Sequence, residues 1–80
     1  MPRQYAMINQ TQYHNVYMMD NQIHVMVPSK DALAKMYDNI VWNHGLIMFN
    51  SINYIFLKEL YREEDPNGNW TAILQVVKDL

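Results

Sequence analysis

The sequence lacks cysteine and is poor in glycine and proline, with two and three copies respectively among 80 residues. Without cysteine, the chain has no disulfide scaffold, no cysteine-ligated zinc site and no thiol nucleophile. The two glycines, Gly45 and Gly68, stand far apart and cannot build a glycine-rich phosphate loop. Several common kinds of chemistry are therefore excluded.

Charge is also scarce. Six Lys and Arg residues against eight Asp and Glu residues give a net charge of −2, and only 18% of the residues are charged. Half of the residues are hydrophobic, which is too many for an intrinsically disordered chain. The basic residues are scattered singly, so the sequence lacks the positive footprint of a nucleic-acid-binding protein. The length predicts one small domain, residues 1–80.

A long hydrophobic run is missing as well. The densest apolar region, residues 46–60, is interrupted by polar and charged side chains and is shorter than the roughly 20 residues that cross a bilayer. Residues 1–5 run into polar sequence, with no apolar stretch of signal-peptide length. These features predict a cytoplasmic protein without a membrane segment.

The first third of the chain predicts three β-strands, at residues 4–9, 13–19 and 22–27. Residues 4–19 carry no formal charge and are rich in Tyr, Met, Gln and Asn, a composition that suits half-exposed strands. Asp20 and Asn21 tolerate the positive φ of a two-residue hairpin turn. That turn sets the register of the second and third strands, which is Met18 opposite Ile23, Val16 opposite Val25, and His14 opposite Val27.

This register divides the hairpin into two faces. The face that we expect to enter the core consists of Val16, Met18, Ile23, Val25 and Val27. The opposite face is amphipathic and consists of Tyr13, Tyr17, Met19, His24 and Met26. We expect this second face to meet water or a binding partner.

The middle of the chain predicts a long helix. Pro28 ends the preceding strand, Ser29 is a suitable N-cap, and Asp31 suits the positive end of the helix. Apolar and aromatic side chains then recur at helical spacing, at Leu33, Met36, Tyr37, Ile40, Val41, His44, Ile47 and Met48. This stripe predicts a helix to about Met48, although Gly45 is suited to an earlier end.

The last third of the chain allows a helix or a hairpin. A helix capped by Asn69 would place Trp70, Ile73, Leu74, Val77 and Leu80 on one stripe. Residues 65–68, Asp-Pro-Asn-Gly, instead match a tight turn, and the acidic residues before it suit a helix C-terminus poorly. We favour the hairpin, which pairs Tyr61 with Ile73, Leu60 with Leu74, and Leu57 with Val77. It directs inward Phe56, Leu60, Trp70, Ala72, Leu74 and Val76, and it directs outward Glu59, Glu63, Thr71 and Gln75.

These elements occur in the order βββαββ. They predict an α+β fold of two layers, in which one long helix packs on one face of an antiparallel sheet of about five strands. In this arrangement no segment is left over to cover the other face of the sheet.

Catalytic and metal-binding patterns are weak. The serines, Ser29 and Ser51, are explained as a helix cap and a turn residue, and neither lies in a nucleophile elbow. The acidic run 63–65 is typical of a solvated hairpin end. The predicted register sends His14 and His24 to opposite faces of the sheet, so they cannot share a metal ion. The sequence predicts no enzymatic activity, no cofactor and no metal site.

The remaining feature is a surface for binding. Tyr and Met are enriched at protein interfaces, and they dominate the exposed face formed by Tyr13, Tyr17, Met19, His24 and Met26. We therefore expect a non-enzymatic protein–protein interaction module. The small, cysteine-free chain is also compatible with a phage- or mobile-element-encoded inhibitor of a host protein. Two alternatives stay open, namely single-stranded nucleic-acid binding by the sheet aromatics and a homodimeric structural protein.

Overall fold

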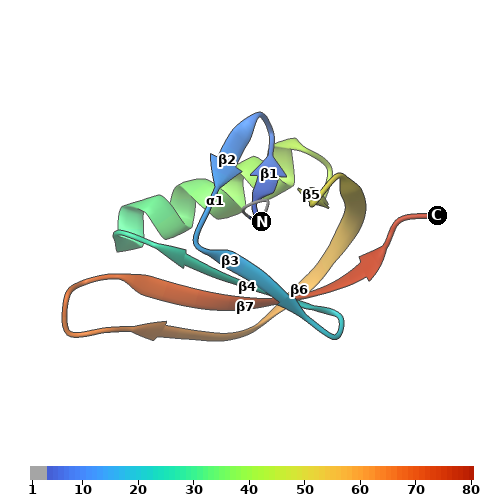
Figure 1. Ribbon diagram of the computed structural model, residues 1–80. Coiled ribbons are helices and arrows are strands. Elements are labelled where there is room, and N and C mark those ends of the chain that lie inside the picture. Colours follow the sequence, from blue (N-terminus) through green and yellow to red (C-terminus); the bar gives the residue numbers. More distant parts are fainter. Residues whose placement is uncertain (1–3) are drawn as a thin grey trace.

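The computed structural model describes residues 4–80. Residues 1–3, which belong to the N-terminal segment where no signal peptide is expected, lie outside the described part of the chain. Its elements are β1 (Ala6–Ile8), β2 (Thr11–Tyr13), β3 (Val16–Met19), β4 (Gln22–Val27), α1 (Lys30–Trp42), β5 (Leu46–Phe49), β6 (Ile52–Glu64) and β7 (Trp70–Lys78). Over residues 4–80 the strands form one seven-stranded antiparallel sheet in the order β2-β1-β5-β6-β7-β4-β3 (Figure 1).

The predicted α+β fold of two layers, with about five strands and one long helix in the order βββαββ, is wrong. The described residues form a seven-stranded sheet with one helix of 13 residues. Two segments account for the difference, because in each of them one expected element is divided into two. The first is the strand predicted at residues 13–19, and the second is the helix predicted to continue to about Met48.

The strand predicted at residues 13–19 is divided because its two ends pair with different strands. β2 pairs with β1 and β3 pairs with β4, at the two ends of the sheet order. His14 and Asn15 lie between β2 and β3 and belong to neither strand. The predicted pair of His14 with Val27 is therefore absent, whereas the rest of the predicted register between β3 and β4 is confirmed.

The helix begins as predicted but ends earlier. Ser29 is the N-cap, and its Oγ accepts a hydrogen bond from the backbone N–H of Ala32 at 3.0 Å. At the other end, His44 and Gly45 have φ values of 59° and 81°, and the N–H of Gly45 donates to the carbonyl of Ile40 at 2.8 Å. Two consecutive left-handed residues cannot continue a helix. The apolar residues beyond them belong to β5, whose burial alternates with a period of two.

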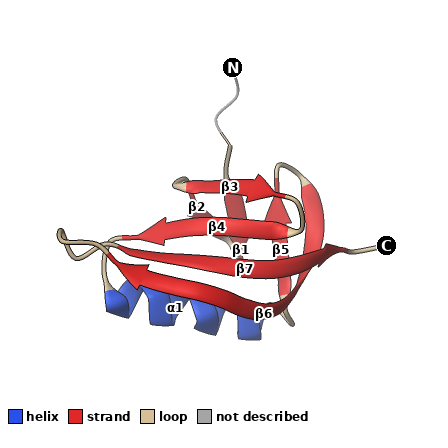
Figure 2. Ribbon diagram, turned by 90° about the horizontal axis from the view of Figure 1, so that it is seen from below, coloured by secondary structure: helices blue, strands red, loops and turns tan. Residues whose placement is uncertain are grey.

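The sheet curls strongly, because its two edge strands are neighbours in the sequence. β2 and β3 are separated by two residues, and the three peptide units from Tyr13 to Val16 span at most about 11 Å. β6 carries much of the curvature, since residues 52–55 pair with β5 and residues 54–64 pair with β7. Figures 1 and 2 show the resulting arrangement, with α1 lying against the concave side of the sheet.

The core fills the space between α1 and the concave side. The helix contributes Leu33, Met36 and Ile40, all of which are buried. The sheet contributes buried side chains from β1, β3, β4, β5 and β7, which include Ala6, Ile8, Val16, Ile23, Val25, Val27, Ile47, Phe49, Ala72, Leu74 and Val76. Alternate residues of the same strands consequently point to the convex side.

The C-terminal segment is the predicted hairpin, formed by β6 and β7, and not a helix. In the turn, Asp65 Oδ1 accepts hydrogen bonds from the backbone N–H groups of Asn67 at 2.8 Å and Asn69 at 3.0 Å. Gly68 supplies the positive φ, 85°, that the turn requires. The predicted pair of Tyr61 with Ile73 is confirmed.

Two β-bulges in β6 change the other predicted pairs. Leu57 and Leu60 are the extra residues of the two bulges. Ile55 therefore pairs with Val77 in place of Leu57, and Glu59 pairs with Leu74 in place of Leu60. Each extra residue reverses the alternation of faces along the strand. As a result, Glu59 lies on the helix side, where it was predicted to point outward, and Leu60 is exposed, where it was predicted to point inward.

Replacing Ile40 with Asp should unfold the protein. Ile40 is 2% exposed, so an unpaired carboxylate there costs roughly 3–5 kcal/mol, which is comparable to the whole stability of a small domain. The control is Val41→Asp, because Val41 is the next residue and is 70% exposed. Thermal melts followed by circular dichroism measure both variants. A cooperative Ile40→Asp melt close to that of the wild type would contradict the orientation of the helix.

Candidate functional site

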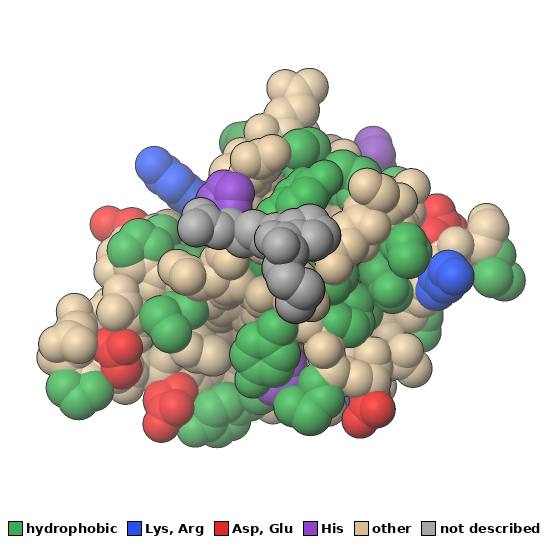
Figure 3. Space-filling view, in the orientation of Figure 1, with side chains coloured by type: hydrophobic (Ala, Val, Ile, Leu, Met, Phe, Trp, Pro, Cys, Tyr) green, Lys and Arg blue, Asp and Glu red, His purple; other side chains and the backbone are tan. Residues whose placement is uncertain are grey.

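The convex side of the sheet is uncovered over β3, β4, β7 and β6, since no helix or strand of residues 4–80 lies across it (Figure 2). We call this surface the outer face. Alternation along the four strands and their pairing assign to it Tyr17 and Met19 of β3, Gln22, His24 and Met26 of β4, Thr71, Ile73, Gln75 and Val77 of β7, and Ile55, Lys58, Tyr61 and Glu63 of β6. In Figure 3, hydrophobic and acidic side chains both lie along the lower rim of the molecule, the side on which β6 and β7 lie in Figure 1.

A row of apolar and aromatic side chains crosses the middle of the outer face. Tyr17 pairs with His24, His24 pairs with Ile73, and Ile73 pairs with Tyr61, so the row spans all four strands. The rings of Tyr17 and His24 stack at 4.5 Å between centroids with an interplanar angle of 16°. Tyr17 and Tyr61, at the two ends of the row, are 49% and 50% exposed. We call these four residues the central row.

His24 is held rather than free within this row. Its residue surface is 9% exposed, and its Nε2 lies 3.1 Å from Gln22 Oε1, so a polar atom of the ring has a partner. The imidazole packs against the face of the Tyr17 ring and thereby restricts its position. Met19 and Met26 flank the stack and are exposed. A hollow of about 490 Å³ beside the stack extends toward His14.

The charges of the outer face stand on opposite sides of the central row. Lys58 pairs with Gln75 in the row on one side, and Glu63 pairs with Thr71 in the row on the other. The outer face thus has one cation and one anion within its strands. Of the other acidic residues of β6 and its turn, Glu64 and Asp65 lie at the hairpin end, and Glu59 lies on the helix side.

The structure brings together four of the five predicted binding residues, namely Tyr17, Met19, His24 and Met26. Tyr13 lies elsewhere. Tyr13 lies on β2 opposite the buried Ala6 of β1, and its hydroxyl accepts a hydrogen bond from Asn39 Nδ2 of the helix at 3.1 Å. The break in the strand at residues 14–15 turns Tyr13 to the helix side, so it does not share the outer face with Tyr17.

Sequence reasoning missed Tyr61 and Ile73 as members of the surface. Their pairing across the C-terminal hairpin was predicted correctly. What was missing was the pairing of β4 with β7, which places this hairpin beside the N-terminal one. No local sequence signal specifies which strands of separate hairpins become neighbours.

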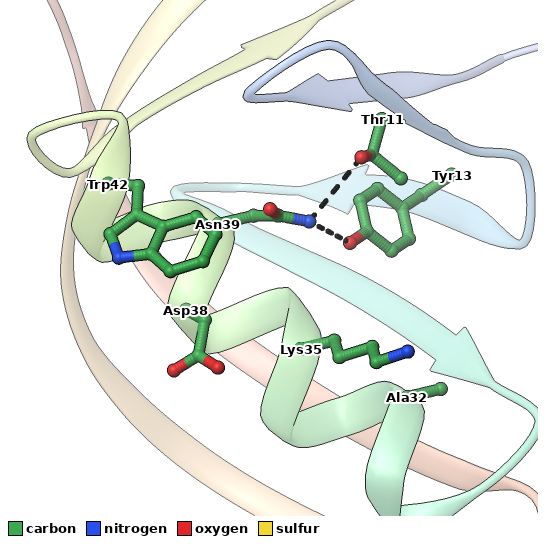
Figure 4. Close-up of a pocket in the computed structure, with 7 residues that line it drawn as sticks. All are labelled: Thr11, Tyr13, Ala32, Lys35, Asp38, Asn39 and Trp42. Carbon is green, nitrogen blue, oxygen red and sulfur yellow. Dashed lines mark hydrogen bonds between the residues drawn. The ribbon is translucent and has the colours of Figure 1, made fainter.

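A second hollow, of about 510 Å³, lies between β2 and α1 (Figure 4). Its central group is the Asn39 amide, which donates to Tyr13 and, at 3.4 Å, to Thr11 Oγ1. The Asn39 carbonyl oxygen accepts from Asn9 Nδ2 at 3.4 Å. The amide therefore joins β2 to the helix, and its hydrogen-bonding capacity is used within the protein. Trp42, at the rim, is exposed.

A polar cluster of Tyr37, Glu59 and Arg62 ties β6 to the helix. The Tyr37 hydroxyl donates to Glu59, and Arg62 Nε donates to both carboxylate oxygens of Glu59 at 2.9 and 3.2 Å. The Arg62 guanidinium also lies over the Tyr37 ring, 5.9 Å from its centroid. Because Leu60 is a bulge residue between Glu59 and Tyr61, this cluster anchors the inward side of the bend that presents Tyr61 outward.

The cluster shifts the ionisation of its members. Burial raises the pKa of Glu59, but the hydrogen bonds from Arg62 and Tyr37 and the positive charge of Arg62 outweigh that effect, so the pKa lies below its ordinary value. Burial, together with the hydrogen bond to Glu59, raises the pKa of Tyr37. Both shifts favour an ionised Glu59 that accepts hydrogen bonds from a neutral Tyr37.

Among residues 4–80, no group of three or more His, Asp and Glu side chains is placed to hold a metal ion. In the same part of the chain, α1 is too short and too polar to pass through a bilayer. Comparison of the chain with protein-family models, curated proteins and solved structures finds no match. The described residues define a structural class, a curled antiparallel sheet around one helix. Its outer face mixes aromatic, apolar and polar side chains, and the chemistry of that face is the basis for the proposed function.

Replacing Glu59 with Gln should reduce the free energy of unfolding at neutral pH by about 1 kcal/mol. The variant loses hydrogen bonds to a charged carboxylate, and partial exposure of the cluster to solvent limits what those bonds contribute. The folded pKa of Glu59 lies below the unfolded one, so this contribution is present above about pH 5 and is lost as the pH falls through the folded value.

Urea unfolding at pH 7 and pH 3 measures the effect, and the difference from the wild type should shrink at pH 3. Glu64→Gln is the matched control, because it removes the same charge from an exposed position of β6. An equal loss in both variants at pH 7 would show that net charge, and not the cluster, is responsible.

Proposed function

We propose that the protein is a non-enzymatic protein–protein interaction module that binds its partner through the outer face. The observation that supports this most directly is the central row, in which two half-exposed Tyr side chains, Tyr17 and Tyr61, end a continuous line of aromatic and apolar side chains across four strands. Tyr is enriched in the parts of interfaces that contribute most binding energy, and Met adapts to the shape of a partner.

The rigidity of the surface favours binding. The side chains stand on hydrogen-bonded strands about 4.8 Å apart, and the Tyr17 ring is already stacked on His24. A preorganised surface loses less conformational entropy on association, so more of the contact energy appears as affinity. Inhibition of a host protein is a narrower form of the same proposal, and it would use the same surface.

The alternative is binding of single-stranded nucleic acid, because bases stack on exposed aromatic rings of a sheet. The charge of the outer face is against it. Lys58 is its one cation among the described residues, and Glu63 offsets that charge. Phosphate contacts supply most of the affinity in such complexes, so a neutral face is a poor match.

Affinity capture from a lysate of the source organism tests the proposal. The tagged wild type should retain a partner that Tyr17→Ala/Tyr61→Ala loses, because this double variant removes both ends of the central row. Trp42→Ala is the matched control, since Trp42 is an exposed aromatic residue on the helix. Capture of the same proteins by all three forms, each with an unchanged melt, would mean that the outer face does not bind them.

An electrophoretic shift assay tests the alternative. With single-stranded DNA and RNA at about 150 mM salt, we expect no shift at micromolar protein, because few phosphates can be neutralised. Tight binding that weakens steeply as salt increases, and that depends on Tyr17, would favour nucleic acid as the partner instead.

A further inference from the structure

We propose that the partner of the outer face is a second copy of this chain, bound in a two-fold symmetric sheet-on-sheet dimer. This inference rests on the proposed function, because it names the occupant of the same surface. The observation that leads to it is the placement of Lys58 and Glu63 on either side of the central row, which makes the outer face complementary to itself in charge.

The positions of these two residues follow from the ladder between β6 and β7. Lys58 stands opposite Gln75, Tyr61 opposite Ile73, and Glu63 opposite Thr71. The three β7 residues are two positions apart, so successive rows are separated by about 7 Å along the strands. Lys58 and Glu63 therefore lie at nearly equal distances from the central row, on opposite sides.

A two-fold axis that runs along the central row, between two outer faces, reverses the strands of the second copy. The row of Lys58 then faces the row of Glu63 of the other copy, and the reverse holds at the symmetric position. Two ion pairs form at the β6 end of the interface, and Tyr61 meets Tyr61 between them. Stacked sheets lie about 10 Å apart where they touch. Because the outer face is convex, the two copies touch over only part of it, and the arrangement requires that part to include β7 and β6, where long Lys and Glu side chains can bridge the gap.

The other in-plane two-fold axis, parallel to the strands, is unfavourable. It sets β6 over β3, which places Lys58 against Met19 because both lie in the same cross-strand row through Gln22 and Gln75. A charge buried against an apolar side chain without a counter-ion is costly. The distribution of charge therefore selects one symmetric arrangement.

The outer face is small for a dimer interface. Four strands about 4.8 Å apart and about seven residues long cover roughly 430 Å² on each copy. The two copies together contribute at most roughly 900 Å², because convex faces do not touch over their whole area, and this is below the standard size of a specific interface. We therefore expect a dimer that dissociates at micromolar concentration.

Sedimentation equilibrium of the purified chain, from about 5 to 500 µM, tests this inference with charge-reversal variants. The wild type should shift from monomer to dimer over this range. Lys58→Glu and Glu63→Lys should each weaken the dimer by about tenfold or more, because every ion pair becomes a like-charge pair. An equimolar mixture of the two variants should restore the dimer, since in the mixed dimer each altered side chain meets an opposite charge.

Neither residue belongs to the Tyr37, Glu59 and Arg62 cluster, and melting curves check that each variant is folded. A wild type that is monomeric at 500 µM overturns the inference, and so does a dimer that is indifferent to the charge reversals or that the mixture fails to restore. If the wild type is monomeric but capture from lysate still depends on Tyr17 and Tyr61, the partner is another molecule and the interaction module stands. If both assays are negative, the outer face is not a binding surface.

Discussion

The short connection between β2 and β3 constrains the whole structure. Two residues join the strands that stand at opposite ends of a seven-stranded sheet, so the sheet has to curl until its edges approach each other. The curl creates a concave side that one helix of 13 residues can fill. It also creates a convex side that nothing in residues 4–80 crosses. The core and the outer face are two consequences of the same closure.

The bulges of β6 determine which side chains reach each side. Each bulge bends the strand and reverses its alternation, so Glu59 turns toward the helix while Lys58 and Tyr61 turn outward. The hydrogen bonds from Tyr37 and Arg62 to Glu59 stabilise this register from inside. A polar cluster at the concave side thereby supports the position of an apolar residue on the convex side. Substitutions in the cluster are expected to affect both stability and the geometry of the surface.

The outer face combines the features of a binding surface with a specific distribution of charge. The central row provides apolar area, the stacked Tyr17 and His24 rings provide rigidity, and Lys58 and Glu63 provide direction. A single uniform apolar patch would allow many relative orientations of two sheets. The two separated charges select one, and this selection is what makes self-association a specific hypothesis rather than a consequence of exposed hydrophobic area.

Local sequence determined the N-cap at Ser29, the register between β3 and β4 and the existence of the C-terminal hairpin, because neighbouring residues specify each of them. It did not reveal β5, since four apolar residues fit a helical stripe and a buried strand equally well. It also placed Tyr13 on the wrong side. Only the tertiary structure brought Tyr61 and Ile73 beside His24, because the pairing of β4 with β7 joins segments far apart in the chain, and the closure of the sheet, not a local pattern, selects that pairing.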